Sequence, residues 1–236
     1  MQLAIDSSTD TASLAIARGN EVLAELTWCC GQNHSVELMP RLSRLLEQAN
    51  IDLKSISGII VARGPGSFNG LRVGISTAKG LAFSLGVPLV GISTLEAIAY
   101  SHAEAGLPVC PILNAGRGEI ATAIYQLKGD RWQQITAEHI STVDALCTKI
   151  TARTIFCGEL TPAIIDELTG RLGQKAIIPP PASRLCRAGF LAELGLKRLQ
   201  SGDCDQPSTL QPIYLRRPQI TQPKNKNRTA NQRNKP

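Results

Sequence analysis

The fold is decided by the N-terminal stretch Leu3-Ala4-Ile5-Asp6-Ser7-Ser8-Thr9, in which a short apolar strand runs into a polar turn. A second apolar run follows over residues 12–17, and a Gly19-Asn20 turn leads to a third run over residues 22–27. Short apolar runs separated by tight turns are typical of antiparallel strands. The N-terminus is therefore predicted to form a three-stranded meander.

The same order of elements returns in the second half of the chain. Apolar runs lie over residues 109–113, 120–127 and 132–135. Each meander is followed by a helical stretch and by a short buried strand that stops before a glycine, at Gly64 and at Gly158. A supersecondary unit that occurs twice predicts an α/β protein with two similar lobes. We expect duplicated ββαβ-type units that face each other across a cleft.

The two lobes are expected to cover residues 1–104 and 105–216. Three prolines at residues 179–181 break the second lobe, and residues 183–200 are predicted to form a final amphipathic helix. This helix and the Pro212-Ile213-Tyr214-Leu215-Arg216 segment could pack back on the first lobe.

The C-terminal tail holds the excess positive charge of the chain. The net charge is +6, and residues 217–236 contain six Lys and Arg residues without any acid, so residues 1–216 are formally neutral. A neutral body excludes a broadly basic nucleic-acid surface, whereas a tail rich in Asn, Gln, Pro and Lys is predicted to be disordered. Two roles are considered for this tail, a solubilising end and a weak attraction to phosphates that salt would screen.

Cysteine usage and the N-terminus indicate the compartment. The seven cysteines form no Cys-x-x-Cys pair, which favours free thiols in a reducing environment over a disulfide framework. The sequence shows no signal peptide and no apolar run of membrane-spanning length, so we expect a cytoplasmic protein without a membrane partner. The three histidines lie far apart, and we predict no metal site.

A second informative stretch is Gly64-Pro65-Gly66-Ser67-Phe68-Asn69-Gly70-Leu71-Arg72-Val73-Gly74, a glycine-rich turn that opens an apolar helix. Glycine allows close backbone approach and helix-opening amides attract anions, while the polar turn at residues 6–9 suits phosphate or magnesium. The candidate nucleotide-binding or phosphate-binding residues are Asp6, Ser7, Ser8, Thr9, Gly64, Gly66 and Ser67. The alternatives are a tight strand-to-helix connection and a polar hairpin whose side chains bond their own backbone.

No set of catalytic residues stands out in the sequence. A phosphotransferase needs a second acid for its metal or for the attacking hydroxyl, yet the matching second-lobe turn carries Asn114, Arg117 and Glu119 without an aspartate. Ser76 and Lys79 match Ser-x-x-Lys, but the partner motifs of that class are missing. We therefore predict no catalytic residue.

Two helices are predicted in the first lobe, over residues 35–50 and 70–85, and they differ in how apolar residues are distributed around the helix. The first carries an apolar stripe that includes Leu38, Leu42 and Leu45. The second has a core stripe on one side, and its opposite side is uncharged and carries Val73, Ser76, Thr77, Gly80 and Phe83. Such a helix is covered on both faces, either by a partner or by the rest of this protein.

Four features occur together in residues 1–216. They are the Asp6-Ser7-Ser8-Thr9 turn, His34-Ser35 ahead of a Leu-rich helix, the glycine turn at residues 64–74 and the Pro212–Arg216 segment. This combination resembles the TsaB family. The sequence departs from the family in Asn69, where the family has Thr, and in Asn114-Ala115-Gly116, where it has Asp-Ala-Arg. The lost carboxylate weakens any metal-dependent activity.

The resemblance implies a two-lobed fold of the actin, hexokinase and Hsp70 superfamily (ASKHA, ribonuclease H-like). It also implies a non-catalytic subunit that binds and activates the paralogue TsaD, in a complex that transfers a threonylcarbamoyl group to N6 of the adenosine next to the anticodon of tRNAs. The ATPase TsaE joins in bacteria, tRNA is engaged through the complex, and ATP or ADP can be present there although this chain requires no cofactor. The implied partner-binding residues are Leu38, Leu42, Leu45, Val73, Ser76, Thr77, Gly80 and Phe83. The same surface could form a homodimer.

Two other functions are weighed against this one. The first is a stand-alone ATP-binding small-molecule kinase or ATPase of the actin-like superfamily that uses Asp6 and the two glycine turns. The least favoured is a peptidase, because paired histidines and a credible triad are missing.

Overall fold

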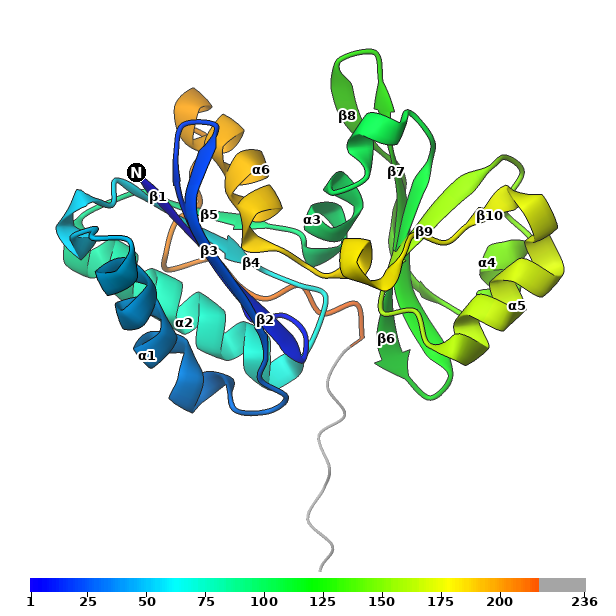
Figure 1. Cartoon of the computed structure of the whole chain (residues 1–236), viewed down its shortest axis with the longest axis horizontal. Coiled ribbons are helices and arrows are strands. Elements are labelled where there is room, and N and C mark those ends of the chain that lie inside the picture. The colour runs from blue at the N-terminus through cyan, green and yellow to red at the C-terminus, as the bar shows by residue number, and fades with distance from the viewer. Residues whose placement is uncertain (217–236) are drawn as a thin grey trace, which may run out of the picture.

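The computed structural model describes residues 1–216 as two lobes, each built on a five-stranded sheet (Figure 1). The first-lobe elements are β1 (Gln2–Asp6), β2 (Thr11–Arg18), β3 (Glu21–Cys29), α1 (His34–Gln48), β4 (Gly58–Ala62), α2 (Phe68–Leu85) and β5 (Leu89–Ile92). After α3 (Thr94–Tyr100) come β6 (Val109–Gly116), β7 (Glu119–Lys128), β8 (Arg131–Ser141), α4 (Val143–Cys147), β9 (Thr154–Gly158), α5 (Pro162–Leu172), β10 (Ala176–Ile177) and α6 (Ala188–Ser201). The predicted disorder of the basic tail concerns residues 217–236, which lie outside the described part of the chain.

The two sheets have the same topology. The strand orders are β3-β2-β1-β4-β5 and β10-β9-β6-β7-β8, so in each sheet an antiparallel meander continues into parallel strands. The predicted duplication of ββαβ-type units is therefore confirmed. One difference is β8, which extends to Ser141, although its apolar run ends at residue 135. Backbone pairing with the long strand β7 keeps the polar residues after position 135 in the β8 strand.

Both faces of the first sheet are covered, which explains why its inner strands are apolar without alternation. Leu3 and Ile5 of β1 face α1 and α2, whereas Ala4 faces α6. The α6 side is lined by small residues, and a Cβ on Gly195 would lie 2.5 Å from Cγ2 of Ile60. The last helix therefore packs closely on the side chains of the sheet.

Two helices each pack on the sheet that is built by the other half of the chain. α3 follows the first sheet in the chain, but its Leu95 and Ile98 pack in the core of the second sheet. α6 follows the second sheet, but its Leu191 and Leu194 pack in the core of the first. The two helices touch where the Tyr100 hydroxyl donates to Glu193 Oε1 at 2.7 Å. A cut near residue 104 would therefore separate each of these helices from the sheet on which it packs (Figure 1).

The final helix begins at Ala188 rather than at residue 183, so its predicted start was wrong. Residues 181–184 form a 3-10 turn after the prolines, and Leu185 is exposed instead of contributing to the apolar face. The start of α6 is set by the first lobe, because Ser13 Oγ accepts from the Ala188 N–H at 2.9 Å and Glu25 Oε1 accepts from the Gly189 N–H at 2.8 Å. None of the helices in residues 1–216 is long and apolar enough to cross a membrane.

Candidate functional site

The polar turn after β1 is turned into the protein. Asp6 has no exposed surface, and its Oδ1 accepts hydrogen bonds from the Ser8 backbone N–H at 2.8 Å and from the Ser8 hydroxyl at 2.6 Å. Its other oxygen, Oδ2, lies 2.7 Å from the Sγ of Cys186, which donates to it. Burial and the neighbouring Asp6 carboxylate raise the pKa of the Cys186 thiol well above its ordinary value, so this donor stays protonated.

The glycine turn lies directly against this polar turn. Ser7 Oγ donates to the carbonyl of Gly70 at 2.8 Å, and the Ser67 N–H donates to the carbonyl of Ser8 at 2.7 Å. A Cβ on Gly66 would lie 2.1 Å from the Ser8 carbonyl oxygen, and a Cβ on Gly70 would lie 2.1 Å from that of Ser7. The glycines are therefore needed for the approach of one turn of this chain to another.

The two remaining candidate residues complete the same cluster. Thr9 is buried, its hydroxyl donates to the carbonyl of Thr11 at 2.8 Å, and its own carbonyl lies 2.8 Å from Nε2 of His34. Gly64 has a φ of +102°, and its missing Cβ leaves room for the Ile213 carbonyl, which would otherwise lie at 2.8 Å.

The seven candidate phosphate-binding residues thus form one cluster, but the polar side chains among them are engaged within the chain. The turn at residues 6–9 as it stands does not fit a phosphate, because the side chains that would bind one are buried and already hydrogen-bonded. The alternative of a polar turn that bonds its own chain accounts for every contact described here. Nucleotide binding at this turn stays a prediction, and we derive no chemical step from it.

The polar groups at the end of β6 are also hydrogen-bonded within this chain. Asn114 Oδ1 accepts from the Gly116 N–H at 2.8 Å, and the Asn114 N–H donates to Glu159 Oε2 at 2.8 Å. Burial raises the pKa of Glu159. Among residues 1–216, no three side chains of His, Cys, Asp or Glu come together as a metal site would require.

The apolar stripe of α1 belongs to the core. Leu38 and Leu42 are each 1% exposed and Leu45 is 6% exposed, all within the cluster beneath the first sheet. The predicted partner-binding role of these three residues is therefore not supported by any exposed surface of theirs in this chain. The apolar stripe of this amphipathic helix is buried against its own sheet, which leaves little of it exposed to a second protein.

Three large apolar side chains of α1 and α2 are nonetheless exposed. Phe83 is 88% exposed, Val36 68% and Met39 46%. On α2, Ser76 and Gly80 are exposed, while Val73 and Thr77 are half-buried. Sequence reasoning missed Val36 and Met39, although both are apolar residues that fall outside the Leu38, Leu42 and Leu45 stripe.

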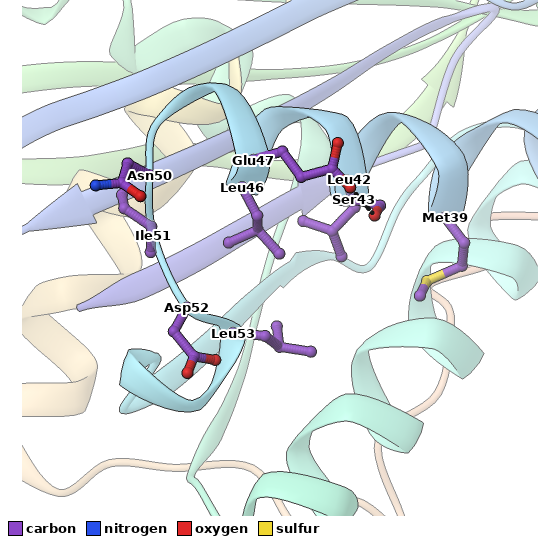
Figure 2. Close-up of a pocket in the computed structure, with 9 residues that line it drawn as sticks. All are labelled: Met39, Leu42, Ser43, Leu46, Glu47, Asn50, Ile51, Asp52 and Leu53. Atoms are coloured by element: carbon purple, nitrogen blue, oxygen red, sulfur yellow. Dashed lines mark hydrogen bonds between the residues drawn. The ribbon is translucent and has the colours of Figure 1, made fainter.

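A cavity of about 580 Å³ lies beside this surface, between the second half of α1 and the loop that follows it. Figure 2 shows its wall: Leu42 and Leu46 project from α1, Leu53 lies opposite, and Met39 marks the end nearest α2. Asp52 lies on the rim. The surface of α1 is thus hollowed next to the exposed Met39.

Comparison with known proteins identifies the family. The model of the TsaD family, described as tRNA N6-adenosine threonylcarbamoyltransferase, matches residues 29–223. The protein "tRNA threonylcarbamoyladenosine biosynthesis protein TsaB" of Bacillus subtilis is 34% identical over 217 residues, which cover 91% of this chain and 93% of the relative. The chain belongs to the TsaB family. The TsaB protein of Escherichia coli is 33% identical over 126 residues, covering 52% of this chain and 54% of the relative.

Solved structures agree on the fold of this TsaB family member. YeaZ from Pseudomonas aeruginosa superposes with a TM-score of 0.76 at 24% identity, covering 91% of this chain and 99% of that one. The activator of 2-hydroxyisocaproyl-CoA dehydratase from Clostridium difficile, solved with bound ADPNP, superposes with a TM-score of 0.50 at 12% identity, covering 85% and 97%. The predicted two-lobed α/β fold is therefore confirmed. The Bacillus subtilis and Escherichia coli relatives are named for tRNA threonylcarbamoyladenosine biosynthesis.

Proposed function

We propose that this chain is a non-catalytic subunit that binds and activates a TsaD protein in the complex that transfers a threonylcarbamoyl group to N6 of the adenosine next to the anticodon. A TsaE ATPase is the further component of the proposed complex. The observation that carries the proposal is the exposure of three large apolar side chains on α1 and α2, namely Phe83, Val36 and Met39. An aromatic side chain that is 88% exposed on a small-residue helix face is the kind of anchor that interfaces bury.

The buried polar turn at residues 6–9 also supports a non-catalytic role for this chain. A kinase or ATPase would hold phosphate at the Asp6–Thr9 turn, yet this turn uses its hydroxyls and its carboxylate to join β1, α2 and Cys186. The proposal therefore gives the chain a binding role and leaves the group transfer to TsaD.

Titration calorimetry of this chain with its TsaD tests the proposal. A Met39→Glu and Phe83→Glu double variant should bind at least about tenfold more weakly, since two charges would be buried in an apolar contact. Ile135→Glu is the matched control, because Ile135 is an exposed apolar residue of β8 in the other lobe. Equal affinities of the double variant and the control would refute the proposal.

Gel filtration of the isolated chain tests whether a second copy of this chain, and not only TsaD, can bind the same surface. If a second copy covers the same surface, the wild-type chain should elute as a dimer and the double variant as a monomer. Purified chain that turned over ATP without TsaD would favour the kinase alternative instead.

A further inference from the structure

One edge of the first sheet is open. β3 is the outermost strand on that side, and in the described part of the chain it pairs with β2 alone. Among residues 1–216, the backbone groups of residues 22–28 form no hydrogen bond beyond this pairing. In an antiparallel strand every second residue directs its N–H and C=O away from the neighbouring strand. β3 therefore presents a row of free backbone donors and acceptors that a further strand could use.

A groove lies beside this edge, between β3 and α1. Its volume is about 540 Å³, and its apolar lining is Leu26 from the strand and Val36 and Pro40 from the helix. Leu26 is half-buried, whereas Val36 is 68% exposed and Pro40 is exposed. The groove shares no lining residue with the cavity of Figure 2. An open strand edge next to an apolar groove is the arrangement by which proteins add an extended peptide to a sheet.

The groove also carries a positive charge. Of the described residues that line it, Arg41 and Arg44 are basic and Glu37 is acidic. Glu37 Oε2 accepts from Arg41 Nε at 2.9 Å, and the Arg41 guanidinium carbon lies 4.9 Å from the centroid of the Trp28 ring. Arg44 is exposed and forms no ion pair or hydrogen bond with another of residues 1–216. The groove therefore has one uncompensated positive charge, which suits an acidic side chain of a partner.

The residues of α1 that line the groove are spaced to match an extended chain. Val36, Pro40 and Arg44 follow one another at four-residue intervals, which correspond to a rise of about 6 Å each. Alternate residues of a strand lie about 6.8 Å apart and point to the same face. A strand added to β3 would thus meet two apolar positions of α1 and then a basic one.

We propose that β3 and α1 bind an extended segment of a partner protein by strand addition, and that this segment presents apolar and acidic side chains at alternate positions. Backbone hydrogen bonds to β3 supply affinity, the groove holds the apolar side chains, and Arg44 selects the acid. The inference goes beyond the proposed function, because the edge of β3 and Arg44 lie outside the surface assigned to TsaD.

Fluorescence anisotropy with a labelled synthetic peptide of eight residues tests the inference on the full-length chain. The peptide has threonine at its odd positions and glutamate, valine, valine and glutamate at its even positions, so an acid can meet Arg44 in either strand direction. A control peptide with lysine in place of both glutamates should bind at least about tenfold more weakly. The difference should shrink as salt is raised from about 50 to 500 mM, since salt screens exposed charges.

Two methylated peptides test the strand pairing itself. Alternate backbone nitrogens carry methyl groups, at the odd positions in one peptide and at the even positions in the other, so each has lost the donors of one edge. One of the two should bind at least about tenfold more weakly than the parent peptide, and the other should lose less. Equal affinities of all three peptides would refute strand addition.

Arg44→Glu tests the charge of the groove. Arg44 is exposed, so the variant should fold as the wild type does, which circular dichroism checks. It should bind the acidic peptide at least about fivefold more weakly than the wild type and the lysine peptide more tightly. Arg131→Glu, exposed at the start of β8 in the other lobe, is the matched control and should leave both affinities unchanged.

No saturable binding of the acidic peptide to the wild-type chain up to about 1 mM would overturn the inference. So would equal affinities of the acidic and lysine peptides, or an Arg44→Glu variant that binds both as the wild type does. The titration with TsaD is a separate measurement. A chain that binds TsaD but not the acidic peptide refutes this inference alone, and the reverse result refutes the proposed function alone.

Discussion

The thiol of Cys186 donates a hydrogen bond to the Asp6 carboxylate, with 2.7 Å between Sγ and Oδ2, although 180 residues separate the two in the chain. Both side chains are buried, and the contact joins the end of β1 to the segment that precedes α6. The bond is therefore one of the few polar ties between the first strand and the chain that returns from the second lobe.

Cys186→Val should destabilise the protein by about 1–3 kcal/mol, because one oxygen of the buried Asp6 carboxylate loses its donor. Cys186→Ser keeps a donor and should cost clearly less. Urea unfolding followed by circular dichroism gives both free energies. Equal losses for the two variants would mean that the thiol contributes packing and not a hydrogen bond.

Two glycines of α2 should respond to alanine in opposite directions. Gly70→Ala places a Cβ 2.1 Å from the Ser7 carbonyl and should cost at least about 1–3 kcal/mol, since a backbone atom must move. Gly80→Ala meets no atom of the described residues within 4 Å apart from its chain neighbours and nearby helix backbone, and should stabilise the helix by about 0.5–1 kcal/mol. Thermal and urea unfolding of the two variants check the prediction, and a stable Gly70→Ala protein would contradict it.

Much of the fold could be predicted because its signals are local. Apolar runs and turns give the strands of both meanders, and helical spacing gives α1 and α2. The start of α6 could not be predicted, since Ser13 and Glu25 of the first lobe set it from far away in the sequence. The crossing of α3 to the second sheet is equally non-local, because any sheet could cover its apolar side.

The candidate site was predicted less well than the fold. Sequence grouped Asp6 with the glycine turn, and the structure brings them together. Sequence could not tell whether these polar groups face a ligand or one another, because the Cys186 donor is remote. For α1, spacing identifies an apolar stripe but not what covers it, so Leu42 was assigned to a partner when it belongs to the core.

Leu42 and Met39 should therefore differ in what their replacement changes. Leu42→Ala should cost about 2–5 kcal/mol of stability, because Leu42 is 1% exposed and belongs to the core beneath the first sheet. Met39→Ala should change stability by less than about 1 kcal/mol, since Met39 is 46% exposed. Urea unfolding measures both. A large loss for Met39→Ala would remove this residue from the proposed TsaD surface.

Buried thiols should make the protein sensitive to alkali. Burial raises the pKa of Cys110 from 9.0 to about 12, and the pKa of Cys157 is raised well above 9.0 for the same reason. Between pH 9 and about 12 the unfolded chain loses these protons while the native protein keeps them. The native state then binds more protons, so the free energy of unfolding falls as pH rises.

Urea unfolding at a series of pH values measures this loss. Stability should be level near pH 7 to 8 and should decrease above about pH 9. Cys110→Ala removes one of the titrating groups, so its stability should decline less steeply over the same range. A variant that declines as steeply as the wild type would show that other groups dominate the alkaline loss.

The docking of α6 on the first lobe should depend on Ser13. The Ser13 hydroxyl accepts from the Ala188 N–H at 2.9 Å and lies 2.9 Å from the Thr27 hydroxyl, to which it is free to donate. Ser13→Ala leaves a buried helix-opening N–H without its acceptor and should cost about 1–3 kcal/mol. Thr27→Val removes only the second bond and should cost less. Urea unfolding ranks the two variants, and amide hydrogen exchange should show faster exchange in the first turn of α6 for Ser13→Ala alone. Equal exchange in both variants would mean that apolar packing of Leu191 and Leu194 holds the helix without help from its N-terminus.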